Sequence, residues 1–251
     1  NTAVGFEALD ANTTAANNVG IGWRALYANT TGTQNTAVGS QAGVALTTGS
    51  NNTAFGFEAL KNEDAHGNNT AIGTQTLFAL NAGADAYNTA VGYQAGAAVS
   101  TGIQNTIIGG LAGDALTAGS YNVAVGYATL SAEDSHGRNV AVGYRSLTTQ
   151  NAGADGNNTA VGFEAGDSVT TGVLNTILGS ESGRYLTTGI NNVVIGAFAA
   201  GHSIGTTTGY QNVIIGNYAD TTAADTANAN ILGYDVSGAA GFTTIGNGTA
   251  D

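Results

Sequence analysis

The sequence predicts an all-β protein, a parallel β-solenoid with coils of mostly 17 residues. Three observations predict it: a five-residue phrase recurs along the whole chain, its last glycines are mostly 17 residues apart, and the composition is 42% hydrophobic with 39 Gly and no Pro. A fixed period of this length is the signature of a stacked repeat architecture. Apolar residues never keep a helical spacing for long, so the repeat unit is expected to be built from strands and turns.

The repeated phrase begins with Asn and ends with an apolar residue followed by Gly, as in Asn1–Gly5, Asn35–Gly39 and Asn105–Gly109. Two of the intervals between the phrase-ending glycines are 19 residues long, one is 20, and the last is 13. Glycine frees the backbone to bend, so one glycine per coil is expected at the end of a short strand. The structural glycines predicted in this way are Gly22, Gly39, Gly56, Gly73, Gly92, Gly109, Gly126, Gly143, Gly162, Gly179, Gly196 and Gly216.

A longer period lies above the coil period. Residues 61–73 match residues 131–143, and residues 80–92 match residues 150–162, both at a displacement of 70 residues. Duplication of a block of four coils is the simplest origin of this pattern.

The positions around each phrase-ending glycine predict the local structure. The residue before the glycine is apolar, and the residue three after it is small in most coils, as Ala25, Ala42 and Ala59 illustrate. We expect a short strand before the glycine and a second short strand after it. Polar tracts such as residues 47–51 then supply the Gly, Asn, Ser and Thr that turns prefer.

Asparagine opens 13 of the 15 phrases. Stacked coils would align these side chains in a ladder at the strand spacing of ~4.8 Å, where each amide can bond to the next rung. The alternative is that Asn is there only because it tolerates a turn conformation. The predicted ladder consists of Asn18, Asn35, Asn52, Asn69, Asn88, Asn105, Asn122, Asn139, Asn158, Asn175, Asn192 and Asn212.

Charge limits the possible partners. The formal net charge is −12, and only five residues are Lys or Arg, so no basic stripe can neutralise a phosphate backbone. We therefore expect no nucleic-acid partner and no insertion into a membrane by this segment, which has no apolar run of the ~20 residues that a span requires. The absence of Cys rules out a disulfide framework and fits an extracellular setting as well as a cytosolic one.

The phrase and its period resemble a known family of fibres. The pattern Asn-Ser/Thr-x-Ala/Val-Ile/Val-Gly, with a small residue three positions later, resembles the head repeats of trimeric autotransporter adhesins. The longer form in residues 35–60 is similar to repeats of bacteriophage tail fibres. The resemblance implies a left-handed β-roll, a homotrimer, and a place on a cell surface or virion fibre. The coil here is longer than that of the adhesin heads, and residues 1–251 contain no segment that resembles their coiled-coil neck or their membrane anchor.

Two related segments offer the most enzyme-like chemistry: residues 63–67, with Glu63, Asp64 and His66, and residues 133–137, with Glu133, Asp134 and His136. A carboxylate beside a histidine could bind a cation or act in acid–base catalysis. Neighbours on one loop rarely converge, so a solvated turn is the expectation.

We accordingly predict no catalytic residue, no metal site and no cofactor. The isolated His202 has no visible partner. No nucleophile elbow or phosphate-binding loop motif occurs either.

Aromatic residues follow the phrase-ending glycine in several coils. Facing outward they could stack on sugar rings, but the row is interrupted, so packing is the preferred interpretation. The row consists of Phe6, Trp23, Phe57, Tyr93, Tyr127, Tyr144, Phe163 and Tyr234.

The functional prediction is a structural shaft or head segment of a surface or virion fibre that takes part in attachment to a host cell or another surface, and is not an enzyme. Residues 1–216 form the regular coils, and residues 217–251 are expected to be irregular terminal coils or a cap that leads to another module, because the phrase degenerates there. The partners expected are further copies of the chain and a cell-surface glycan or protein receptor.

The two 19-residue coils carry their extra residues in the segments 81–87 and 151–157, which share the sequence Asn-Ala-Gly-Ala-Asp. They are expected to bulge on the same edge, and they are the first candidates for receptor contact because insertions in solenoids map to loops on one face. The candidate contact residues are Asn81, Asp85, Tyr87, Asn151, Asp155 and Asn157.

In the phrases up to Gly216, the residue two before the glycine is Ala, Ile, Val or Gly and is never charged. The positions on either side of it are Thr or apolar, so the strand is apolar on both faces, which predicts burial on both. We expect the flanking positions to pack inside the coil and the alanines to face neighbouring chains. Two other functions stay open: an ice-binding solenoid, suggested by Thr2, Thr36, Thr53, Thr70 and Thr89, and a fibre-borne enzyme that degrades polysaccharides.

Overall fold

The computed structural model describes residues 1–133, 135–201 and 207–247. It is an all-β parallel solenoid of about 14 turns with coils of about 17 residues, so the fold class predicted from the repeat is confirmed. The chain divides into two compact units, residues 1–124 and 125–251, and each is described by itself. Nowhere in the described part of the chain is there a helix long and apolar enough to cross a bilayer.

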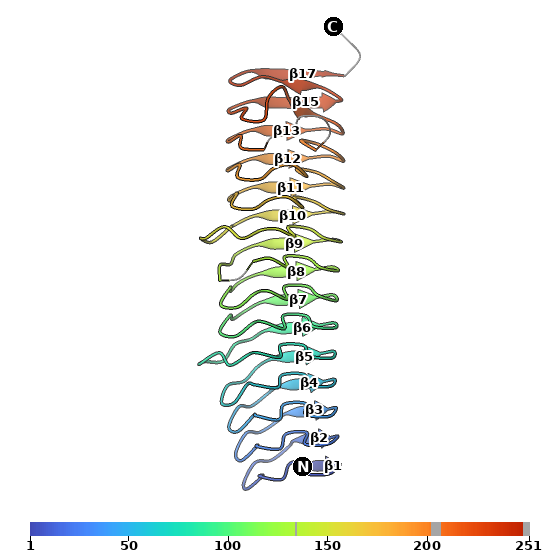
Figure 1. Ribbon diagram of the computed structural model, residues 1–251, viewed down its shortest axis with the longest axis vertical. Helices are drawn as coiled ribbons and strands as arrows, with labels where there is room; N and C mark the ends of the chain where they lie inside the picture. Colours follow the sequence, from blue (N-terminus) through green and yellow to red (C-terminus); the bar gives the residue numbers. More distant parts are fainter. Residues whose placement is uncertain (134, 202–206, 248–251) are drawn as a thin grey trace. The chain divides into compact units, whose positions relative to one another are not determined.

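The first unit is a stack of short parallel strands, one from each coil (Figure 1). The register follows the sequence period: Thr36 pairs with Thr53 one 17-residue coil later, and Thr70 pairs with Thr89 across a 19-residue coil. Strand β8 (Val123–Val125) contains the boundary between the units. The strands before it are β1 (Thr2–Val4), β2 (Val19–Ile21), β3 (Thr36–Val38), β4 (Thr53–Phe55), β5 (Thr70–Ile72), β6 (Thr89–Val91) and β7 (Thr106–Ile108).

The second unit repeats this arrangement. Its register again follows the phrase, with Val140 paired to Thr159 and Val193 paired to Val213 across the 20-residue interval. The regular strands are β9 (Val140–Val142), β10 (Thr159–Val161), β11 (Thr176–Leu178), β12 (Val193–Ile195) and β13 (Val213–Ile215).

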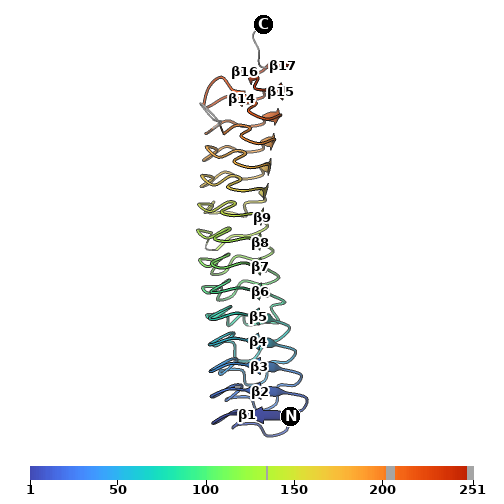
Figure 2. The same cartoon turned by 90° about the vertical axis from the view of Figure 1, so that its right-hand side faces the viewer.

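The C-terminal coils of the second unit differ from the rest. Strands β15 (Asn230–Tyr234) and β17 (Thr243–Asn247) are each five residues long and pair across the 13-residue interval. Beside them, β14 (Asp220–Thr221) and β16 (Ser237–Gly238) form a separate two-stranded parallel sheet (Figure 2). The last coils therefore contain a second strand that the regular coils lack.

The predicted second strand after each phrase-ending glycine is wrong for the regular coils. The backbone there forms consecutive turns, with non-glycine residues in the left-handed region, for example Glu58 at φ 55° and Leu60 at φ 51°. Their N–H groups bond in opposite directions, from Glu58 to the carbonyl of Ser40 and from Leu60 to the carbonyl of Thr76. This conformation satisfies the backbone between coils as a strand would, but it is uncommon outside glycine, so the sequence pattern did not predict it.

The predicted orientation of the strands is also wrong. The residue two before the glycine faces the interior, and Ala37, Ala90 and Ala141 are almost fully buried. The positions on either side of it point outward instead. The physical reason is space: a small residue at the centre of the strand leaves room for the leucines contributed by the turns, such as Leu60 and Leu77, which are fully buried.

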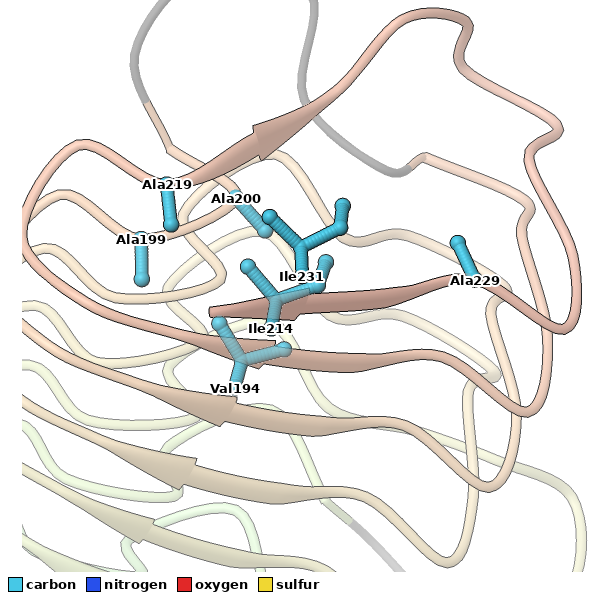
Figure 3. Close-up of a cluster of buried hydrophobic side chains, with 7 residues drawn as sticks. All are labelled: Val194, Ala199, Ala200, Ile214, Ala219, Ala229 and Ile231. Carbon is cyan, nitrogen blue, oxygen red and sulfur yellow. The ribbon is translucent and has the colours of Figure 1, made fainter. Parts of the chain in front are cut away.

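In the interior, a large residue at the centre of a strand goes with a small residue in the turn that packs against it, and a small one goes with a large one. Where the strand centre is Ile107, the turn residue in the adjacent coil is Gly96, and a Cβ added there would lie 2.9 Å from Ile107 Cδ1. Where the centre is Ala71, the turn residue is Leu77. A close-packed interior requires such compensation, because added volume forces strain. Figure 3 shows the interior of the second unit, where Val194, Ile214 and Ile231 from the strands lie among small alanines. The buried cluster consists of Val194, Ala199, Ala200, Ile214, Ala219, Ala229 and Ile231.

The phrase-opening asparagines form a buried hydrogen-bonded ladder within each unit. In the first unit, the backbone N–H of Asn105 donates to Oδ1 of Asn88, and its Nδ2 donates to the carbonyl of Gly119. In the second unit, Asn175 donates from its N–H to Oδ1 of Asn158 and from Nδ2 to the carbonyl of Gly189. Each of these side chains thus hydrogen-bonds to one backbone carbonyl and one backbone N–H. The asparagines therefore do more than tolerate a turn conformation.

Candidate functional site

The outward strand face is the most extensive candidate surface. We use this name, within each unit, for the side chains one and three residues before the phrase-ending glycine. It includes exposed apolar groups, with Val4 57%, Phe55 54% and Ile108 39% exposed. In the first unit it consists of Thr2, Val4, Val19, Ile21, Thr36, Val38, Thr53, Phe55, Thr70, Ile72, Thr89, Val91, Thr106, Ile108 and Val123.

The outward strand face carries no charge in either unit. Its members in the regular strands of the second unit are Val125, Val140, Val142, Thr159, Val161, Thr176, Leu178, Val193, Ile195, Val213 and Ile215. These side chains are half-buried or exposed in the single chain. Val161 is the exposed member of this set and the others are half-buried, and uncharged, mostly apolar surface that reaches solvent over several rungs is typical of a site of interaction.

Charged side chains lie on the turn side of the coils, where they pair with one another. In the first unit Lys61 Nζ lies 2.6 Å from Glu58 Oε1, and Gln75 donates to the other oxygen of the same carboxylate. The hydrogen bond from Lys61, followed by that from Gln75, lowers the pKa of Glu58. In the second unit Arg145 pairs with Asp167, and Arg184 pairs with Glu164.

The aromatic row after the glycine is exposed, so it faces solvent in the single chain. In the second unit, the rings of Tyr127 and Tyr144 stack with centroids 5.8 Å apart, and those of Tyr144 and Phe163 with centroids 5.2 Å apart. Their planes differ by only 12° and 10°. Because the rings cover each other's faces, they present mainly edges to solvent, and a sugar that needs a free ring face finds little room between them.

The two long loops protrude from equivalent positions of their coils, one in each unit. In both, the Asp anchors the loop to the preceding coil: Asp85 Oδ1 accepts the N–H of Gly67, and Asp155 Oδ1 accepts the N–H of Gly137. Asp155 also pairs with Arg138 at 3.0 Å. The exposed groups left for contact include Asn81 and Tyr87 in the first unit and Asn151 and Asn157 in the second.

The expectation of a solvated turn at residues 63–67 is wrong for Glu63, whereas Ala65 is exposed and Asp64 and His66 are half-buried. Glu63 is fully buried at the coil position that Leu46 and Leu80 occupy in adjacent coils, and ligand atoms of Glu63, Asp64 and His66 lie within 4.8 Å of one another. His66 Nδ1 is 3.4 Å from Glu63 Oε1, and the same carboxylate accepts the N–H groups of His66 and Ala82. These hydrogen bonds give the carboxylate a role in closing the loop.

The duplicate in the second unit has the same core. Glu133 is fully buried, its Oε1 accepts the N–H of His136 at 3.2 Å, and His136 Nδ1 lies 3.6 Å away from it. Asp134 and His202, which the sequence also singled out, lie outside the described residues. The sequence signal for burial was available, because Glu63 and Glu133 stand seven residues after a phrase-ending glycine, where the coils on either side have Leu or Gln.

No family model, curated protein or solved structure matches this chain. Its stacked parallel strands define it as a β-solenoid repeat protein.

Proposed function

We propose that this chain is a shaft or head segment of a homotrimeric, extracellular fibre, on a cell surface or a virion, that takes part in attachment. The observation that supports this most is the uncharged outward strand face of a chain whose net charge is −12. A solenoid that stays alone in water gains nothing from such a face, whereas a fibre of several chains buries it. The left-handed winding and the number three come from the resemblance to adhesin and tail-fibre repeats.

A structural role, and not catalysis, is supported by how the coil uses its buried polar groups. The asparagine ladder satisfies backbone groups of adjacent coils, and Glu63 closes a loop. Neither arrangement leaves a nucleophile aimed at an open space. We therefore assign the chain a mechanical and binding role, with a cell-surface glycan or protein as the receptor.

Attachment is expected to depend on the two long loops. Replacing residues 81–87 with the five-residue linker 100–104, and residues 151–157 with the linker 170–174, should preserve the fold, since these linkers connect regular coils at the same positions. We expect binding of labelled protein to a panel of bacterial and epithelial cells to fall at least about tenfold, which corresponds to ~1.4 kcal/mol. Unchanged binding to cells that capture the original chain would place receptor contact elsewhere.

Ice binding is the second candidate, because Thr36, Thr53 and Thr70 belong to the outward strand face and not to the interior. It ranks lower because Val replaces Thr in several rungs and Phe55 projects from the same face. Clear thermal hysteresis at millimolar protein would reverse this order.

A further inference from the structure

The outward strand face is chemically unlike the rest of the surface. Described ion pairs such as Lys61 with Glu58 and Arg145 with Asp167 involve turn residues. Two chains that each carry a net charge of −12 repel one another at most approaches. At an uncharged face this repulsion is weakest, while burial of apolar area is most favourable. The chemistry therefore favours an apolar partner over a basic or acidic one.

The regular repeat of the outward strand face further limits the kinds of partner that can cover it. Within each unit its side chains repeat once per rung, because Thr53 pairs with Thr70 and Phe55 with Ile72 in register, and the rungs follow the ~4.8 Å strand spacing. A second copy of the same unit presents the same repeat. Two such faces can therefore interdigitate at rung after rung, which an irregular protein surface cannot do.

The form of the side chains supports close contact. Most members of the face are Val, Ile or Thr, whose β-branched side chains have few rotamers and lose little freedom when they are covered. The backbone beneath them is held by the sheet register and by the buried asparagine ladder. The face is thus a preorganised surface, and preorganisation lowers the entropic cost of association.

We propose that the outward strand face is the surface through which copies of this chain associate, with rungs of one copy packed against rungs of another. The inference rests on the proposed fibre function and specifies its interface. It places the inward alanines in the core of each coil, where they take no part in association.

The test uses charge on the face and an equal charge elsewhere. Ile72→Lys with Ile108→Lys puts two lysines on the outward strand face, two coils apart. The matched control, Ala65→Lys with Thr101→Lys, adds the same charge at exposed turn positions with the same spacing. Sedimentation equilibrium is expected to show a dissociation constant raised about 100-fold or more by the face pair, since unpaired charge at an interface core opposes binding, and little change for the control pair.

A second measurement covers the case in which the lysine pair does not fold. Because the chain has no Cys, a single Val91→Cys gives one thiol on the outward strand face, and Thr101→Cys gives the control. Mild oxidation should join copies of the Val91→Cys variant much faster than copies of the control.

The possible outcomes distinguish failure of the proposed interface from failure of the proposed fibre function. An original chain that is oligomeric, with a face-lysine variant of unchanged mass or equal crosslinking of the two cysteine variants, overturns this interface and leaves the fibre intact. An original chain that is a folded monomer overturns both the interface and the oligomeric fibre, and loss of cell binding on loop replacement alone would then still support an attachment role.

Discussion

Gly92→Ala is expected to destabilise the first unit by more than about 4 kcal/mol, the range reached only when a substitution breaks a specific structural feature. Gly92 has φ +136°, and a Cβ built on it would lie 2.5 Å from the carbonyl oxygen of Gly109 in the next coil. Gly109 directly follows the paired residue Ile108, and its own N–H is bonded to the carbonyl of Val91, so this oxygen cannot move away cheaply. Strain and overlap act together, and chemical denaturation followed by circular dichroism measures the loss.

Gly83→Ala is the matched control, because it is the same substitution within the same coil. Gly83 also has positive φ, at +71°, but no heavy atom lies within 4 Å of a Cβ added there. Only the left-handed conformation of alanine is then penalised, by about 1–2 kcal/mol. Equal losses for the two variants would contradict the close stacking of the glycine column.

Asn105→Ala is expected to lower the free energy of unfolding by about 2–6 kcal/mol, because it leaves two buried polar groups unsatisfied and each costs roughly 1–3 kcal/mol. The substitution removes the acceptor for the N–H of Asn122, at 2.9 Å, and the donor to the carbonyl of Gly119, also at 2.9 Å. Both partners are buried, so water cannot replace the lost hydrogen bonds without opening the coils.

The control for the asparagine ladder is Gln104→Ala, one residue earlier. Gln104 is exposed and has φ +56°, which glutamine and alanine tolerate about equally, so its loss should stay within ~0.5 kcal/mol. An Asn105→Ala variant as stable as Gln104→Ala would mean that the asparagines serve only the turn conformation.

Much of the fold follows from the period of the sequence. The intervals of 17, 19, 20 and 13 residues between glycines reappear as the offsets between paired strands, as between Thr36 and Thr53 or between Asn230 and Thr243. Parallel stacking allows little else, because one phrase per coil must meet the same phrase in the next coil. The direction of the side chains did not follow, since alternation identifies two faces of a strand without saying which one is inside.

A signal for the inner face was nevertheless present. Ile107 replaces Ala at the centre of its strand. The two turn positions that pack near it are both glycine: Gly96, four residues after the phrase-ending Gly92, and Gly113, four residues after the phrase-ending Gly109. Only positions that share an interior need such an exchange of volume.

The turn conformation after the glycine could not be foreseen in the same way. Residues such as Leu60 adopt positive φ because inter-coil hydrogen bonds and burial override their intrinsic preference. For the candidate site, the long loops were identifiable from the repeat length, whereas the burial of Glu63 required its coil position to be compared with Leu46 and Leu80.

Sedimentation equilibrium of the 251-residue chain at micromolar concentration, with circular dichroism of the same sample, tests the central claim most directly. The proposed fibre predicts a folded oligomer, with three times the 24.7-kDa chain mass if the copies are three. A stable dimer would agree with burial of the outward strand face between copies, but it would refute a trimer. A folded chain that sediments at 24.7 kDa over the whole concentration range would contradict the account.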